Sequence, residues 1–111
     1  MIDQTIYNEL MDLFTIEELR KIFSCFEITM KEDIDILEEY LITGDNSRLR
    51  GMTHSIIGSA LSFGLIPLGE SAKTLNSAVK HKTLVVDEVN DLILKINSTI
   101  LWLKLNIINN V

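Results

Sequence analysis

The sequence predicts an all-α protein, specifically an antiparallel up-down-up-down four-helix bundle with a short leading N-terminal helix. Apolar residues recur at spacings of three and four along nearly the whole chain, and no long segment alternates as a strand would. The connections between the expected helices are only a few residues long, so consecutive helices should be antiparallel neighbours. With 111 residues, 47% of them hydrophobic, the chain is expected to form a single domain, residues 1–111, without an internal repeat or a linker.

A short helix is expected around residues 3–12, and a long helix, or two nearly collinear ones, follows it. Thr15 and Glu18 form a capping box that marks its start, and Gly44 is a typical C-terminal stop. Its apolar stripe comprises Leu19, Ile22, Phe23, Phe26, Met30, Ile34, Leu37 and Leu41. The acidic residues of "EITMKEDIDILEE" flank that stripe and are expected on its solvated face. Cys25 is expected to be a small buried thiol.

Three further helices complete the expected bundle. The first should take its N-cap from the polar residues 45–47 and end at Gly64. Its inner stripe is Leu49, Thr53, Ile56, Ala60 and Phe63. Pro67 suits the first turn of the second, whose inner face is Leu68, Ala72, Leu75 and Val79. The last should begin within residues 83–87, with a stripe of Val89, Leu92, Ile93, Ile96, Ile100, Leu103 and Ile107.

The distribution of charge limits the possible partners. The net charge of −6 argues against nucleic-acid binding, which needs a basic surface. Residues 1–45 hold twelve acidic and three basic residues, whereas residues 46–111 hold four acidic and seven basic ones. The first residues lack the features of a secretory signal, and the most apolar stretch, "ILWLKLNII", is too short to span a bilayer. We therefore expect a cytoplasmic protein with no nucleic-acid partner and no membrane insertion.

The stretch "RGMTHSIIGSALSFG" combines one histidine with two glycines inside a helical pattern. His54 follows the inner residue Thr53 by one position, about 100° round the helix, so it is expected on the flank or the outside. Its neighbours one turn away are Arg50, Gly51, Ile57 and Gly58. Because each interior glycine costs about 1 kcal/mol relative to alanine, the pair needs an explanation. Either the glycines allow close helix packing, or they leave the imidazole clear for another macromolecule. In the second case, an adjoining apolar patch would suit docking. That patch is formed by Ile57 and Leu61.

The following helix is expected to bring further side chains near His54. Counted from the turn between the two helices, His54 and Asn76 are equally distant, so they should lie level on antiparallel helices. An amide beside an imidazole can hold its Nδ1 and leave Nε2 free as a nucleophile. Lys80, one turn beyond Asn76, and Arg50 would supply positive charge nearby.

The segment "HSIIGSALSFG" resembles the signature of histidine-containing phosphotransfer (HPt) domains. That signature has a phosphorylatable histidine followed by glycines at the fourth and tenth positions, and His54, Gly58 and Gly64 match it. The flanking "GDNSRLRGMTH" and "LIPLGESAKTLN" are also typical of the family. The resemblance covers the whole chain and implies a short leading helix plus a four-helix bundle. Two positions depart from the pattern. Ile57 replaces a frequent lysine, and Asn76 replaces a glutamine or glutamate.

The resemblance implies a phosphorelay intermediate. His54 would accept a phosphoryl group from a receiver-domain aspartyl phosphate and pass it to another response-regulator receiver. A hybrid sensor histidine kinase is the other implied partner. The supporting residues would be Asn76, Lys80, Gly58 and Arg50, and the docking residues Gly51, Ile57 and Leu61. Without a Gly-rich phosphate loop, the chain is expected to have no ATP-dependent kinase activity and to bind no cofactor. Magnesium is expected on the partner receiver, and no metal site on this chain.

Two other functions compete with this one. A helical adaptor that docks on a receiver domain or kinase without being phosphorylated stays open, because Ile57 replaces the usual lysine. A metal-binding bundle of the carboxylate type needs inward-facing Glu-x-x-His pairs. Gly51 and Ala78 stand three residues before His54 and His81, so the sequence disfavours a metal site.

Overall fold

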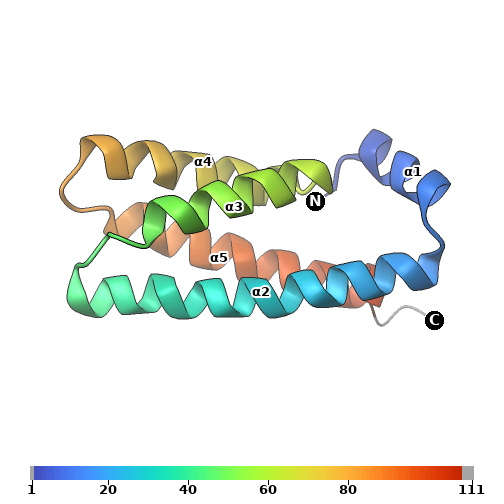
Figure 1. Cartoon of the computed structure of the whole chain (residues 1–111), viewed down its shortest axis with the longest axis horizontal. Coiled ribbons are helices and arrows are strands. Elements are labelled where there is room, and N and C mark those ends of the chain that lie inside the picture. Colours follow the sequence, from blue (N-terminus) through green and yellow to red (C-terminus); the bar gives the residue numbers. More distant parts are fainter. Residues whose placement is uncertain (1, 109–111) are drawn as a thin grey trace.

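The computed structural model describes residues 2–108, and all regular structure in that range is helical. The all-α fold class is therefore confirmed. The helices are α1 (Gln4–Leu13), α2 (Ile16–Thr43), α3 (Leu49–Ser62), α4 (Ile66–His81), α5 (Val86–Leu103) and a π-helical turn, η1 (Lys104–Ile108). The four long helices lie side by side along the 44 Å axis of the molecule, and α1 sits at one end (Figure 1). No helix in the described range is long and apolar enough to cross a membrane.

Both predicted ends of α2 are confirmed. The Thr15 hydroxyl accepts the Glu18 N–H at 3.1 Å, and the Glu18 carboxylate accepts the Thr15 N–H at 3.0 Å. At the other end, Gly44 adopts a left-handed φ of 73° and donates its N–H to the Tyr40 carbonyl oxygen. These caps satisfy backbone groups that a helix end would otherwise leave unpaired.

The core stripe of α2 contains one residue that the spacing misassigned. Leu19, Phe23, Met30 and Leu37 are buried, as predicted. The stripe continues through Tyr40, which is 2% exposed, while Leu41 is 38% exposed. Steps of three and four from Leu37 fit a helix equally well. The Tyr40 hydroxyl accepts the N–H of buried Val85 at 3.0 Å, and that hydrogen bond favours Tyr40 at this position.

Two other local predictions are wrong. No side chain caps α3, whose N-cap is Arg48; instead, the Asp45 carboxylate accepts the Ser47 N–H at 3.0 Å and stabilises the preceding turn. Cys25 is exposed rather than buried. It follows the buried Phe23 by two positions, about 200° round the helix, which places its thiol on the outer face.

The predicted core faces of the remaining helices are largely confirmed. Along α3 to α5 the buried members are Leu49, Thr53, Ile56, Ala60, Leu68, Ala72, Leu75, Val89, Leu92, Ile96, Ile100 and Leu103. Phe63, Val79 and Ile93 are only partly buried. The last helix was expected to continue to Ile107, but α5 ends at Leu103 and the stripe continues through η1. There the carbonyl oxygen of buried Ile107 accepts a hydrogen bond from Arg20 of α2 at 3.2 Å.

The register of α3 against α4 follows from two contacts. A Cβ added to Gly69 would lie 3.5 Å from the Ala60 Cβ, so the two helices approach closely there. Thr53 precedes Ala60 by seven residues, and Asn76 follows Gly69 by seven residues. There the Thr53 hydroxyl lies 3.1 Å from Asn76 Oδ1. Because the paired positions decrease on α3 as they increase on α4, these two helices are antiparallel. Their register agrees to within one residue with the predicted pairing of His54 and Asn76.

The N-terminal segment is attached to the turn between α3 and α4. Asp3 donates its N–H to the Gly64 carbonyl oxygen at 2.7 Å, and a Cβ on Gly64 would lie 3.0 Å from the Ile6 Cβ. Gly64 has a φ of 71°, which side-chain-bearing residues rarely adopt. This residue therefore has two separate reasons to be glycine.

The paired variants Gly64→Ala and Gly44→Ala separate those two reasons. Both glycines have a left-handed φ, but a Cβ on Gly44 would meet nothing within 4 Å. We expect a loss in the free energy of unfolding of about 1 kcal/mol for Gly44→Ala and about 3 kcal/mol for Gly64→Ala. Urea unfolding measures both values. Equal losses would mean that the packing of Ile6 on the turn contributes nothing.

Candidate functional site

His54 lies in the middle of α3 with its side chain exposed, as predicted. Thr53, the preceding residue, is 0% exposed, so the boundary between buried and exposed positions of α3 lies between these two residues. In the described part of the chain, no hydrogen bond or ion pair involves the His54 imidazole. The ring is therefore exposed and open to approach from outside.

The two glycines beside His54 are not packing residues. A Cβ added to Gly51 or to Gly58 would meet nothing within 4 Å among the described residues. Close packing between helices therefore cannot explain them. The glycine that does lie at the α3–α4 contact is Gly69, against Ala60 and Leu61. Of the two explanations that the sequence left open, free access to the imidazole is the one consistent with this geometry.

Asn76 contacts the residue before the histidine, not the histidine itself. Its Oδ1 lies 3.1 Å from the Thr53 hydroxyl, which is also 2.8 Å from the Leu49 carbonyl oxygen. The expected hydrogen bond from Asn76 to the His54 imidazole is absent from the described residues. Thr53 is buried and His54 is exposed, and the side chain of Asn76 reaches the buried residue of the two. Asn76 thus contacts the helix that carries His54 without contacting the imidazole by a hydrogen bond.

Two cations lie one turn from the His54 level. The α3–α4 register places Lys80 of α4 level with Leu49, the residue before Arg50 on α3. Both side chains are exposed, and neither has an ion-pair partner within residues 2–108. Lys80 also lies in the last turn of α4, where a positive charge interacts favourably with the helix dipole. Two positive charges without a described ion-pair partner therefore lie on this side of the molecule, although the net charge of the chain is −6.

The predicted apolar docking patch is partly used by the fold. Ile57 and Leu61 are each half-buried. Ile57 packs against the core, and the Leu61 side chain lies against Gly69 of α4. Only their outer surfaces are available to a partner, so the patch is smaller than the sequence indicated.

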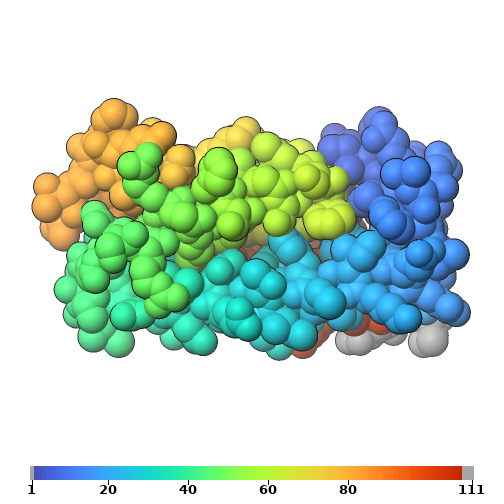
Figure 2. Space-filling view, in the orientation of Figure 1, coloured from blue at the N-terminus to red at the C-terminus, as the bar shows by residue number. Residues whose placement is uncertain are grey.

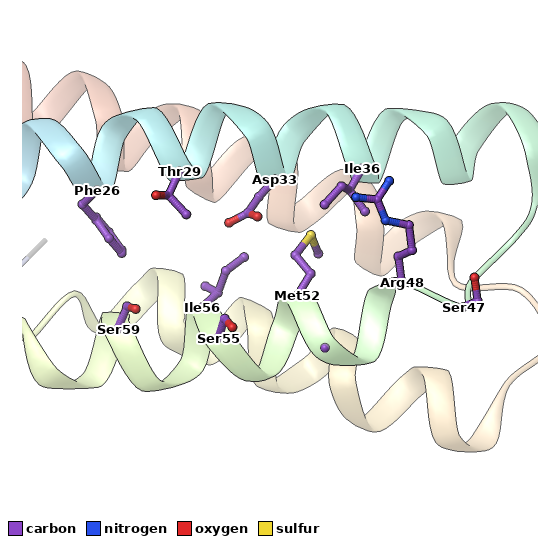
Figure 3. A pocket seen from close by; sticks show the side chains of 11 residues that line it. Phe26, Thr29, Asp33, Ile36, Ser47, Arg48, Met52, Ser55, Ile56 and Ser59 are labelled. Carbon is purple, nitrogen blue, oxygen red and sulfur yellow. The ribbon is translucent and has the colours of Figure 1, made fainter.

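A groove between α2 and α3 was not predicted. It has a volume of about 430 Å³, and both helices lie on the face seen in Figure 2. Asp33 projects into it from α2 (Figure 3). Burial raises the pKa of the Asp33 carboxyl to about 6, and neighbouring Glu32 adds to the effect. The expectation that every acid of this segment is solvated is thus wrong for Asp33. Its position three residues after Met30 and four before Leu37, both buried, is the signal that would have revealed it.

Comparison with protein-family models, with curated proteins and with solved structures gave no match. The site therefore has to be interpreted from its own geometry. Within residues 2–108, no three His, Cys, Asp or Glu side chains are grouped so that they could hold a metal ion. The chemical groups available are an exposed imidazole with nearby cations on one side of α3 and a half-buried carboxylate on the other.

The titration of Asp33 predicts how stability depends on pH. Its folded-state pKa of about 6 is above the ordinary 3.8, so the folded chain retains this proton over a range in which the unfolded chain has released it. The resulting stability is fully present below about pH 4 and is lost as the pH rises through about 6. Asp33→Asn should raise the free energy of unfolding at pH 7.5 by about 1 kcal/mol, a value reduced from the full shift because the side chain is half exposed.

Urea unfolding of the wild type and Asp33→Asn at several pH values between 4 and 7.5 measures this effect. The exposed Asp35 on the same helix supplies the matched control, Asp35→Asn. A constant difference between wild type and Asp33→Asn across the whole range would show that burial does not perturb Asp33.

Proposed function

We propose that the chain is a phosphorelay intermediate of the HPt type, in which His54 carries the phosphoryl group. The observation that supports this most is the exposed imidazole on α3, flanked by two glycines with open space above them. A phosphoryl donor must come within about 3–3.5 Å of the attacking nitrogen, so a side chain on either glycine would restrict its approach. The proposal includes the antiparallel up-down-up-down four-helix bundle with a leading helix, supported by the α3–α4 register and the short connections.

The proposed reaction is a transfer between an acyl phosphate and an imidazole. His54 Nε2 attacks phosphorus, and an N–P bond forms as the P–O bond to the partner's aspartate breaks. The aspartate leaves as a carboxylate, and the proton on Nδ1 passes to water. Transfer to a second receiver is the same step in reverse. Since no described side chain holds Nδ1, the partner or solvent sets the orientation of the ring.

The proposed partners are response-regulator receiver domains and a hybrid sensor histidine kinase. The phosphorylation pocket of a receiver is acidic, and magnesium would be bound there and not by this chain. Arg50 and Lys80, both exposed, would favour encounter with such a pocket despite the overall charge of −6. The chain itself would supply a positioned nucleophile on a rigid element.

A second candidate function is a non-phosphorylated adaptor that docks on a receiver domain or kinase. The observation that favours it is Ile57, which stands where a lysine is usual and packs partly against the core. No cation is therefore available one turn after His54 to neutralise a phosphoryl group. Both functions use the same exposed face of α3, and they differ in whether a covalent phosphohistidine forms.

Phosphoryl transfer distinguishes the two functions. The purified chain is mixed with magnesium and with receiver domains from the same source that carry a radiolabelled aspartyl phosphate. We expect acid-labile, base-stable label on the wild type and none on His54→Gln. His81 is exposed at the end of α4, so His81→Gln is the matched control and should be labelled like the wild type.

Label that persists in His54→Gln would exclude His54 as the carrier. If receivers bind the wild type but none transfers label, the adaptor function replaces the phosphorelay proposal.

A further inference from the structure

The groove between α2 and α3 adjoins the exposed face of His54, and the lining of the groove does not include the imidazole. Its two walls come from facing turns of the helices, whose side chains point toward each other across the gap (Figure 3). The walls are mainly apolar, formed by Phe26, Ile36, Met52 and Ile56. Thr29, Ser55 and Ser59, which carry hydroxyl groups, also line the groove. The groove thus combines apolar surface with a few hydrogen-bonding groups, as small-molecule sites do.

The Asp33 carboxylate is the charged group of α2 that lines this groove, and nothing in the described chain compensates it. It has no ion-pair partner within residues 2–108. The other charged residue of the lining, Arg48, is held at 3.4 Å by Glu39. Burial and neighbouring Glu32 both raise the pKa of the Asp33 carboxyl, and no cation opposes them. Partial burial without a partner destabilises the charged form of a carboxyl group. A bound cation would relieve that cost.

We propose that the groove binds a small organic cation in which a primary ammonium group is attached to an apolar chain or ring. The ammonium group would pair with Asp33, and its remaining N–H donors would reach the hydroxyl groups of the walls. The apolar part would lie between Met52 and Ile56 on α3 and Phe26 on α2. A volume of about 430 Å³ suits a small molecule of this kind. The uncompensated carboxylate selects a cation over a neutral ligand of the same shape.

This proposal does not rest on phosphoryl transfer at His54. Asp33 and the apolar walls would bind a cation whether or not the histidine is phosphorylated. The two sites share one helix, however, since Ser55 of the groove directly follows His54 in the sequence.

The probe for this site is 2-phenylethylamine, with the uncharged 2-phenylethanol as its matched analogue. Both are titrated into the isotope-labelled full chain at pH 7.5 and followed by NMR. We expect the amine to shift the amide signals of Met52, Ser55 and Ile56, and to move the titration of the Asp33 carboxyl carbon to lower pH. The alcohol should bind at least about tenfold more weakly.

Asp33→Asn should weaken binding of the amine at least about tenfold, while the control Asp35→Asn should leave it unchanged. Equal affinity for the amine and the alcohol would overturn the proposal, as would wild-type affinity in Asp33→Asn. Absence of binding at roughly millimolar concentrations of the amine would also overturn it. Amide-signal shifts confined to the pocket beside His81 and Lys82 would overturn the proposal as well.

Discussion

The close packing of α3 on α4 is the contact on which the arrangement of all the candidate functional residues depends. At one point Gly69 of α4 lies opposite Ala60 of α3, and seven residues away Thr53 contacts Asn76. These contacts define the position of α3 along its axis relative to α4, and the face of α3 that is turned toward α4. A rotation of α3 by a single residue, about 100°, would turn the next residue, His54, inward in place of Thr53. The burial of Thr53 together with its apolar neighbours on α3 therefore keeps the histidine outside, although the Thr53 hydroxyl makes no hydrogen bond to the imidazole.

The helical fold was predictable because periodic apolar spacing and helix caps are local signals. The capping box at Thr15 and the left-handed Gly44 and Gly64 needed no tertiary information. The burial of Tyr40 in place of Leu41 could not be predicted locally, because its partner Val85 is 45 residues away in sequence. The exposure of His54 followed from its place beside Thr53. The partner of Asn76 could not be predicted from the sequence. A helix register that is correct to one residue still leaves open which of two adjacent side chains Asn76 contacts. The partial burial of Asp33 could have been predicted from its place between the buried Met30 and Leu37, but the groove beside it could not, because its width depends on how far two helices separate.

The two faces of α3 differ because its neighbours pack on it unequally. Toward α4 the helix is in close contact, whereas toward α2 it leaves a groove with an uncompensated carboxylate. Between these faces, Gly51 lies beside His54 and also lines the groove. An exposed glycine inside a helix lowers its stability, and no contact among the described residues compensates for this at Gly51. The proposed function supplies a reason, because a partner that must reach the imidazole benefits from a bare helix surface on both sides of it.

The most direct test of this account is the double variant Gly51→Leu, Gly58→Leu, examined for both stability and phosphoryl transfer. Leucine favours a helix over glycine, and a Cβ at either position meets nothing within 4 Å. The free energy of unfolding should therefore rise by about 1.5 kcal/mol for the two substitutions together. The rate of label transfer from a phosphorylated receiver should fall at least about tenfold, because the side chains obstruct the approach to His54. A variant that is less stable, or one that transfers at the wild-type rate, would contradict the conclusion that these glycines keep His54 accessible.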